Sequence, residues 1–170
     1  MVDMQNTELE EKVRLITKII LTNQQKMIRE EDIKNLCDKF DFEEIINNVY
    51  GNLQKVGFEL ITTKFLEQKY YVLTTEGKDD NITPSQYGTL ALILALSKEI
   101  DENIKLSDLK EIFSDVWESD VEFLISQDYL RKIDIEGLDI VKVTPLGKAI
   151  MKNVIENLQL KNLLKTFKRD

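Results

Sequence analysis

The chain has 170 residues, with 23 lysines and arginines against 31 aspartates and glutamates, so its formal net charge is −8. It contains no histidine and a single cysteine, Cys37. These absences exclude imidazole catalysis, serine–histidine and cysteine–histidine nucleophiles, histidine-containing zinc sites, all-cysteine metal sites and intrachain disulfides. So acidic a chain is also a poor candidate for nonspecific coating of nucleic acid, because cations on phosphate drive that binding.

The remaining residues offer no nucleophile–base pair, metal-ligand set or phosphate-binding glycine loop, so we expect a protein that is not an enzyme and has no cofactor. The longest uncharged apolar stretch, Leu90 to Leu96, is far too short to span a bilayer, so no membrane association is expected. A single thiol and an acidic, polar N-terminus without signal-peptide character are typical of an intracellular protein. Cys37 lies on the apolar side of a predicted helix and is expected to be a buried small hydrophobe.

The first half predicts three helices followed by a β-hairpin. Apolar residues recur at helical spacing, and Gly57 follows the third helix as a left-handed stop. Two β-branched and aromatic runs come next, separated by a charged turn. The predicted helices run from about Glu8 to Thr22, from Glu30 to about Phe40 and from Phe42 to Val56, and the strands are Phe58–Thr63 and Tyr70–Thr74.

The second half predicts the same order after a polar segment that has turn composition. Its first helix has Thr83 or Ser85 as the cap and Pro84 in the first turn, and Ser107 is the expected cap of the second helix. Thr144-Pro145 opens a final long helix. The predicted elements are helices over Tyr87–Ile100, Ser107 to about Phe113 and about Asp115 to Gln127, strands over Tyr129–Ile135 and Leu138–Val143, and a helix from Pro145 to about Phe167.

The repeated order predicts a tandem of one small module, because Asp32–Leu36 aligns with Asp108–Ile112 at an offset of about 76 residues. Three helices and a two-stranded wing form the winged-helix plan. We therefore expect an α+β fold, mainly α with small β-hairpins, made of tandem winged-helix domains and a long C-terminal helix. Leu90–Leu96 is apolar on all sides, which predicts packing against its own module and also against the first module or a partner. The expected boundaries are 1–75 for the first domain, 76–82 for the linker, 83–144 for the second domain and 145–170 for the C-terminal helix.

Several motifs, in order between about Val13 and Leu158, resemble those of the MAGE homology domain. Gln25 to Ile33 is similar to that family's start of the second helix, and Gly57-Phe58-Glu59-Leu60 is similar to its turn into the first wing. Phe123 to Leu130 and Pro145 to Ala149 resemble the entries to the second wing and to the final helix. The resemblance is closest to the MAGE-like (Nse-three-type) subunit of the Smc-five/six complex. ScpB-type subunits of condensins share the plan and are the related alternative within the kite group of tandem winged-helix proteins.

This resemblance implies a scaffold. Kite subunits clamp a kleisin, the flexible chain that closes the ring of an SMC ATPase, and they usually act in pairs. We therefore expect a kleisin subunit and a second tandem winged-helix subunit, or a second copy of this chain, as partners. The SMC ATPase would be contacted indirectly, DNA contact is a further option, and the location would be on chromosomes. MAGE-like members also pair with a RING-type protein.

The charge pattern bears on DNA binding. The alternative function is a winged-helix transcription regulator that binds DNA directly, and it would need cations and amides on its third helix. Here the two third helices begin with acidic runs at Asp41 and Asp115. Positive charge lies instead between Lys142 and Arg169, where seven cations face a single glutamate, for a net charge of +6. These cations either complement the dipole of their own helix or contact a phosphate or an acidic partner.

The candidate site residues form two groups. Four apolar or aromatic residues are expected to contact a partner helix: Tyr87, Leu90, Leu94 and Trp117. For Trp117, packing in the core is the competing interpretation. Six cations are the candidates for contact with DNA or an acidic partner: Lys148, Lys152, Lys161, Lys165, Lys168 and Arg169.

Overall fold

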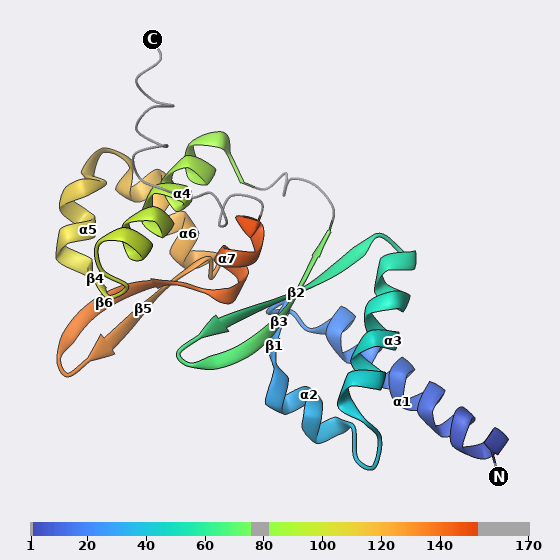
Figure 1. Cartoon of the computed structure of the whole chain (residues 1–170). Coiled ribbons are helices and arrows are strands. Elements are labelled where there is room, and N and C mark those ends of the chain that lie inside the picture. The colour runs from blue at the N-terminus through green and yellow to red at the C-terminus, as the bar shows by residue number, and fades with distance from the viewer. Residues whose placement is uncertain (1, 76–81, 153–170) are drawn as a thin grey trace. The chain divides into compact units, whose positions relative to one another are not determined.

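The computed structural model describes residues 2–75 and 82–152 (Figure 1). The chain divides into two compact units, residues 1–78 and 79–170, and each is described by itself. The first unit contains α1 (Val2–Thr22), β1 (Met27–Arg29), α2 (Glu30–Leu36), α3 (Phe42–Lys55), β2 (Phe58–Phe65) and β3 (Gln68–Thr75). This order of elements, three helices and a hairpin, is that of a winged-helix domain.

The helices of the first unit differ from the prediction at their ends. α1 begins six residues before Glu8, because the polar N-terminal turn has no apolar periodicity to reveal it, although Asp3 in that turn favours a helix start. α2 stops at Leu36 instead of Phe40, and Asp38, with a φ of 52°, turns the chain toward α3. Asp41 caps α3 by accepting a hydrogen bond from the Glu44 amide. Gly57, with a φ of 85°, ends this segment as predicted.

The core of the first unit joins the inner faces of its three helices to one face of its sheet. Cys37 is 2% exposed and its thiol donates to the Ile33 carbonyl, which confirms it as a buried hydrophobe. Burial raises the pKa of this thiol. The buried core residues are Val13, Ile16, Ile20, Ile33, Cys37, Ile45, Ile46, Val49, Leu53, Leu60, Tyr71 and Leu73.

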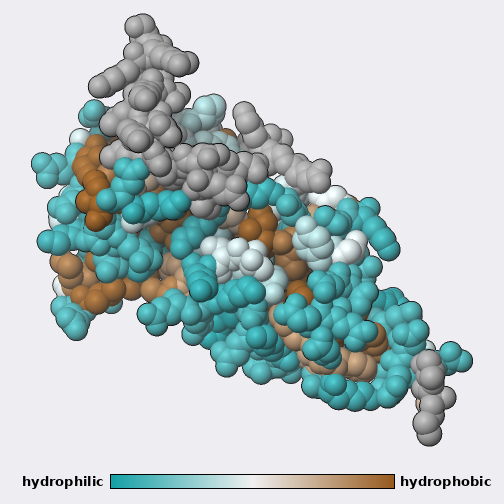
Figure 2. All heavy atoms as spheres, in the orientation of Figure 1, coloured by the Kyte–Doolittle hydropathy of each residue, from teal (hydrophilic) through white to brown (hydrophobic). Residues whose placement is uncertain are grey.

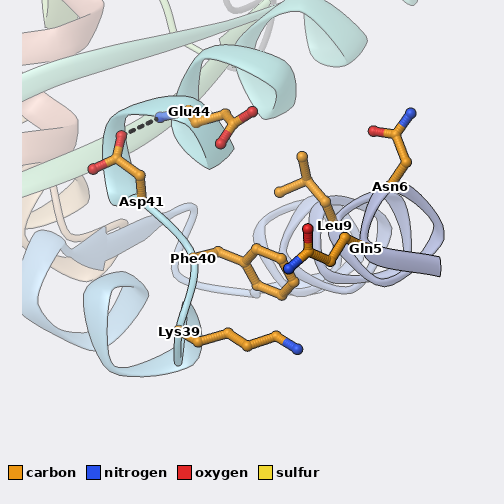
Figure 3. A pocket seen from close by; sticks show the side chains of 7 residues that line it. All are labelled: Gln5, Asn6, Leu9, Lys39, Phe40, Asp41 and Glu44. Atoms are coloured by element: carbon orange, nitrogen blue, oxygen red, sulfur yellow. Dashed lines mark hydrogen bonds between the residues drawn. The ribbon is translucent and has the colours of Figure 1, made fainter. Parts of the chain in front are cut away.

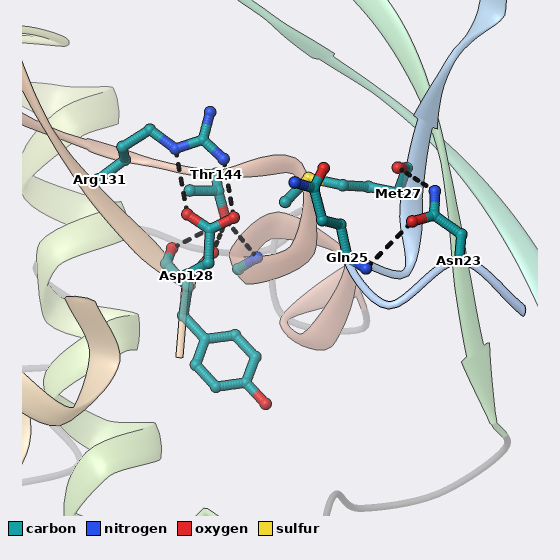
Figure 4. A network of polar contacts seen from close by, with 8 residues as sticks. Asn23, Gln25, Met27, Asp128, Arg131 and Thr144 are labelled. Carbon is teal, nitrogen blue, oxygen red and sulfur yellow. Dashed lines mark hydrogen bonds and ion pairs between the residues drawn. The ribbon is translucent and has the colours of Figure 1, made fainter. Parts of the chain in front are cut away.

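The sheet of the first unit has the order β1-β3-β2 and is antiparallel throughout. β1 was not predicted, because three residues carry no alternation and this strand is defined only by its pairing of Met27 with Val72. The Asn23 side chain holds the turn before it, accepting from the Gln25 amide and donating to the Met27 carbonyl (Figure 4). A two-residue turn at Leu66 and Glu67, both with positive φ, joins β2 to β3.

The second unit repeats this arrangement, with a sheet order of β4-β6-β5. A capping box of Thr83 and Gln86 starts α4, so Thr83 is the cap and Ser85 is not. α5 begins directly after Lys105, so Ser107 is not its cap. The elements are α4 (Pro84–Glu99), β4 (Ile104–Lys105), α5 (Leu106–Ile112), a 3-10 turn η1 (Ser114–Val116), a π-helical turn η2 (Trp117–Val121), α6 (Glu122–Ser126), β5 (Leu130–Ile135), β6 (Leu138–Val143) and α7 (Pro145–Ile150).

The predicted third helix of the second unit is broken into η1, η2 and α6. A buried carboxylate lies at the break: Asp120 is 3% exposed and accepts hydrogen bonds from the hydroxyls of Ser85, Thr89 and Ser119 at 2.7, 2.8 and 3.1 Å. Asp120 belongs to the acidic run that begins at Asp115, and no residue beside it in the sequence indicates its burial. The three hydroxyl groups replace the hydrogen bonds to water that the carboxylate loses on burial. Two of them, from Ser85 and Thr89, connect the broken helix to the start of α4.

The entry to α7 packs closely against the start of β5 (Figure 4). The Thr144 hydroxyl donates to the carbonyl of Asp128 at 2.5 Å and accepts from the Gly147 amide at 3.1 Å, so this one side chain caps α7 and anchors it. Arg131 holds both carboxylate oxygens of Asp128. α7 ends at Ile150 with Met151 as its C-cap, and the part of the predicted long C-terminal helix beyond Lys152 lies outside the described residues.

Candidate partner-binding surface

Two of the four residues expected to contact a partner are core residues. Leu90 is fully buried and Leu94 is 3% exposed, and both belong to the cluster under α4. They therefore cannot reach a partner helix while the unit is folded. Because α4 is apolar on every side, its sequence could not distinguish the inner face from the outer one. The accessible apolar residues on this helix are Leu92 and Leu96, which are half-buried.

Leu92 and Leu96 line an open apolar groove of about 410 Å³. The opposite wall is formed by Ile112 and Phe113 at the end of α5 and by Val116 in η1. Ile112 is 57% exposed, a high value for a large aliphatic side chain, whereas Phe113 forms the buried floor. Figure 2 shows hydrophobic surface over the part of this unit that carries α5. The lining of the groove is mostly apolar, with Asp115 as its one charged residue.

One wall of the groove comes from an acidic segment of the chain. Residues 98–118 carry seven exposed carboxylates against three lysines, a net charge of −4. One of these carboxylates, Asp115, lines the groove directly. An apolar floor with an acidic margin favours a helix that has one apolar face flanked by lysines or arginines. The exposed carboxylates are Glu99, Asp101, Glu102, Asp108, Glu111, Asp115 and Glu118.

The two aromatic candidates lie between core and surface. Trp117 opens the π-helical turn, packs against the core and is half-buried, while its indole N–H donates to Glu122 at 3.2 Å. The ammonium of Lys110 lies 5.4 Å from the centre of the Trp117 ring, within cation–π range. Tyr87 is half-buried and also packs against the core. Trp117 therefore packs against the core, and its contact with a partner stays a prediction.

The six candidate cations are only partly within the described residues. Lys148 on α7 is half-buried, and burial lowers its pKa, so it is not a fully solvated charge. Lys152 is also half-buried. The other four, Lys161, Lys165, Lys168 and Arg169, lie outside the described residues.

Neither third helix presents a basic face. α3 begins with exposed Glu43 and Glu44. Both carboxylates lie in the first turn, the end of a helix that negative charges prefer. In the second unit the corresponding segment is split into short turns, and Glu118 and Glu122 are exposed on it. Reading of the major groove by these elements is disfavoured by charge in the first unit, and by both charge and geometry in the second.

A charged cluster on the first unit surrounds Glu30 at the start of α2. Its carboxylate is bound by Lys34 at 2.8 Å and Lys69 at 2.9 Å, and the Tyr71 hydroxyl donates to it at 3.2 Å. The hydrogen bond from Lys34 and the charge of Lys69 lower the pKa of Glu30 to about 2, against the opposing effect of burial. Burial raises the pKa of Tyr71. This cluster therefore joins α2 to β3 through paired charges.

Replacing Glu30→Gln should destabilise the first unit in a pH-dependent way. The folded-state pKa is lowered, so the charged carboxylate stabilises the fold above its ordinary pKa near 4.5, and this stabilisation is lost as the pH falls toward 2. We expect a loss of about 1–2 kcal/mol at pH 7 that falls to about a quarter of that at pH 2.5, which lies just above the folded-state pKa. Urea unfolding followed by circular dichroism at both pH values measures this, with Glu31→Gln as the control. An equal loss at both pH values would contradict the assignment.

A second hollow, of about 430 Å³, lies on the first unit between α1 and the loop that precedes α3 (Figure 3). Leu9 and Phe40 provide its apolar side, and Gln5, Asn6 and Glu44 make the rest polar.

Within residues 2–75 and 82–152, no cluster of three or more acidic or cysteine side chains could hold a metal ion. None of the helices in these ranges combines the length and the apolar character that a bilayer crossing requires.

Comparison with known proteins bears on the fold. No family model matches the sequence, and no curated protein matches it. The chain is similar in fold to a chain in the solved structure of the Nse1-Nse3-Nse4 complex. The similarity covers 95% of this chain and 97% of that one, with a TM-score of 0.52 and 20% sequence identity. At this identity the similarity shows a shared fold over both units.

Proposed function

We propose that this chain is a non-enzymatic scaffold subunit of an SMC-like chromosome complex, and that it binds a kleisin helix and a second tandem winged-helix subunit. The observation that carries the proposal is the open apolar groove of the second unit, in a chain whose whole length follows the fold of a chain from the Nse1-Nse3-Nse4 complex. A scaffold needs exposed apolar surface, and Ile112 in this groove is 57% exposed.

The groove formed by Leu92, Leu96, Ile112, Phe113 and Val116 is the proposed kleisin site. It would accept a helix with apolar residues at positions i, i+3 or i+4 and i+7. Asp115 in the lining, within the segment 98–118 of net charge −4, would favour a helix whose flanking residues are basic, since opposite charges at the rim speed association. Within this proposal, Trp117 contributes to the rim through its half-exposed ring.

Replacing Ile112→Glu tests the proposed site. Ile112 is 57% exposed, so the unit should fold normally. A glutamate at this position would have to bury its carboxylate against the apolar face of the bound helix without a partner, which weakens binding. We expect the affinity for a kleisin fragment to fall about 30-fold or more, as for a central contact residue. Isothermal titration of the full chain with helical fragments of a kleisin measures this loss.

Ile135→Glu provides the matched control, because Ile135 is 42% exposed on β5 and does not line the groove. This variant should bind as the unaltered chain does. Failure of the chain to bind any kleisin fragment would overturn the proposed function. Equal losses in both variants would overturn the assignment of the groove.

A further inference from the structure

The C-terminal residues 153–170 carry a sequence pattern that matches the apolar groove between α4 and α5. They lie outside the described residues, and their sequence places Leu160, Leu164 and Phe167 at positions i, i+4 and i+7. On a helix these three side chains would form one apolar stripe. This is the spacing that an apolar groove accepts from a docked helix.

The charges of the segment and the groove are opposite. On a helix the cations of the segment would lie along one side of the apolar stripe. Asp115 lines the groove, and Asp108 lies one helical turn before Ile112 on α5. Within residues 2–75 and 82–152, neither carboxylate takes part in an ion pair. Between Leu158 and Arg169 there is no acid, and the cations are Lys161, Lys165, Lys168 and Arg169.

The start of the segment is fixed to the unit that holds the groove. Met151, the C-cap of α7, is 5% exposed and belongs to the core cluster against which Leu92 and Leu96 pack. Leu160 follows Lys152 by eight residues, which span up to about 28 Å when extended. A unit of this size has a radius of gyration of about 11 Å. The segment is therefore long enough to reach the groove of its own unit.

We propose that residues 160–167 dock as a helix in this groove and compete there with the kleisin. This inference rests on the proposed function, since it names the regulation of the same site. A tethered segment has an effective concentration in the millimolar range, so a weak contact is enough to cover the groove in most chains. The affinity for a kleisin is then reduced to the fraction of chains in which the groove is open.

A disulfide experiment on the full chain measures the contact without any kleisin. Under mild oxidation, the double variant Ile112→Cys/Leu164→Cys should form an intramolecular disulfide about tenfold faster than the control Ile135→Cys/Leu164→Cys. Ile135 is exposed on β5 and does not line the groove, so it is a matched partner for the same cysteine. The native Cys37 is buried and does not compete. Peptide mass spectrometry identifies the product.

A kleisin titration of the full chain tests the competition. Leu164→Glu should raise the affinity for a kleisin fragment about fivefold, because the groove is no longer covered. Asn162→Glu is the matched control: it adds the same charge two residues away, on the opposite side of a helix, and should change the affinity less than about twofold. Circular dichroism checks that both variants fold.

Disulfide formation at the rate of the Ile135 control would overturn the proposal, whatever the kleisin result. A disulfide between two chains would also overturn it, because the groove would then belong to a second copy. An affinity left unchanged by Leu164→Glu would overturn the competition. If the intramolecular disulfide forms rapidly and no kleisin fragment binds, the docked segment stands while the proposed function fails.

Discussion

Gly147→Ala should destabilise the second unit by about 3 kcal/mol, the largest effect we expect from adding a single methyl group to this chain. A Cβ atom at Gly147 would lie 2.3 Å from the carbonyl oxygen of Tyr129 and 2.9 Å from Cγ1 of Val143. The Tyr129 carbonyl cannot move away easily, because it accepts a hydrogen bond from the Thr144 amide. The added methyl group must therefore push α7 away from β5.

Urea unfolding followed by Trp117 fluorescence measures this effect directly, since the single tryptophan of the chain lies in the second unit. Gly88→Ala is the matched control: Gly88 lies inside α4 and a Cβ there meets nothing within 4 Å. Alanine favours helix over glycine, so the control should be stabilised by about 0.5–1 kcal/mol. A Gly147→Ala midpoint close to that of the control would show that the α7 junction is not tightly packed.

Asp120→Ala should cost the second unit about 2–3 kcal/mol. The carboxylate is 3% exposed and receives hydroxyl hydrogen bonds from Ser85, Thr89 and Ser119. Its removal leaves the buried Thr89 hydroxyl without its acceptor and disconnects α4 from the π-helical turn. Because that turn begins at Trp117, the emission of the folded protein should also change.

The measurement is again urea unfolding, with two comparison variants. Asp120→Asn keeps the shape and one acceptor oxygen, so it should lose less than the alanine variant. Ser119→Ala removes only one part-buried hydrogen bond and should cost at most about 1 kcal/mol. If Ser119→Ala were as damaging as Asp120→Ala, the carboxylate would not be the centre of this network.

Local sequence signals predict the elements that are defined by capping residues, glycines or hydrophobic periodicity. Gly57 permits a positive φ at the end of a helix segment, Thr83 caps α4, and the alternation in β5 and β6 defines a hairpin. The repeated order of helices and hairpin was visible for the same reason. These features depend on contacts between residues near one another in the chain, so periodicity and capping residues reveal them.

Distant pairings could not be predicted in this way. β1 and β4 have three and two residues, and each is a strand only because β3 or β6 lies beside it. No local pattern indicates that Asp120 is buried, since its hydroxyl partners Ser85 and Thr89 are more than 30 residues away. The π-helical turn around Asp120 could not be predicted either, because it also depends on contacts with the distant start of α4.

The candidate site shows the same division. Composition and the order of elements are properties of the chain alone, so the sequence shows an acidic, histidine-free protein with a repeated module. It also predicts an apolar helix at the start of the second module. Only the tertiary structure decided that Leu90 and Leu94 face inward while Leu92, Leu96 and Ile112 line a groove. A helix that is apolar all round has no preferred inner face until its neighbours pack against it and bury one side.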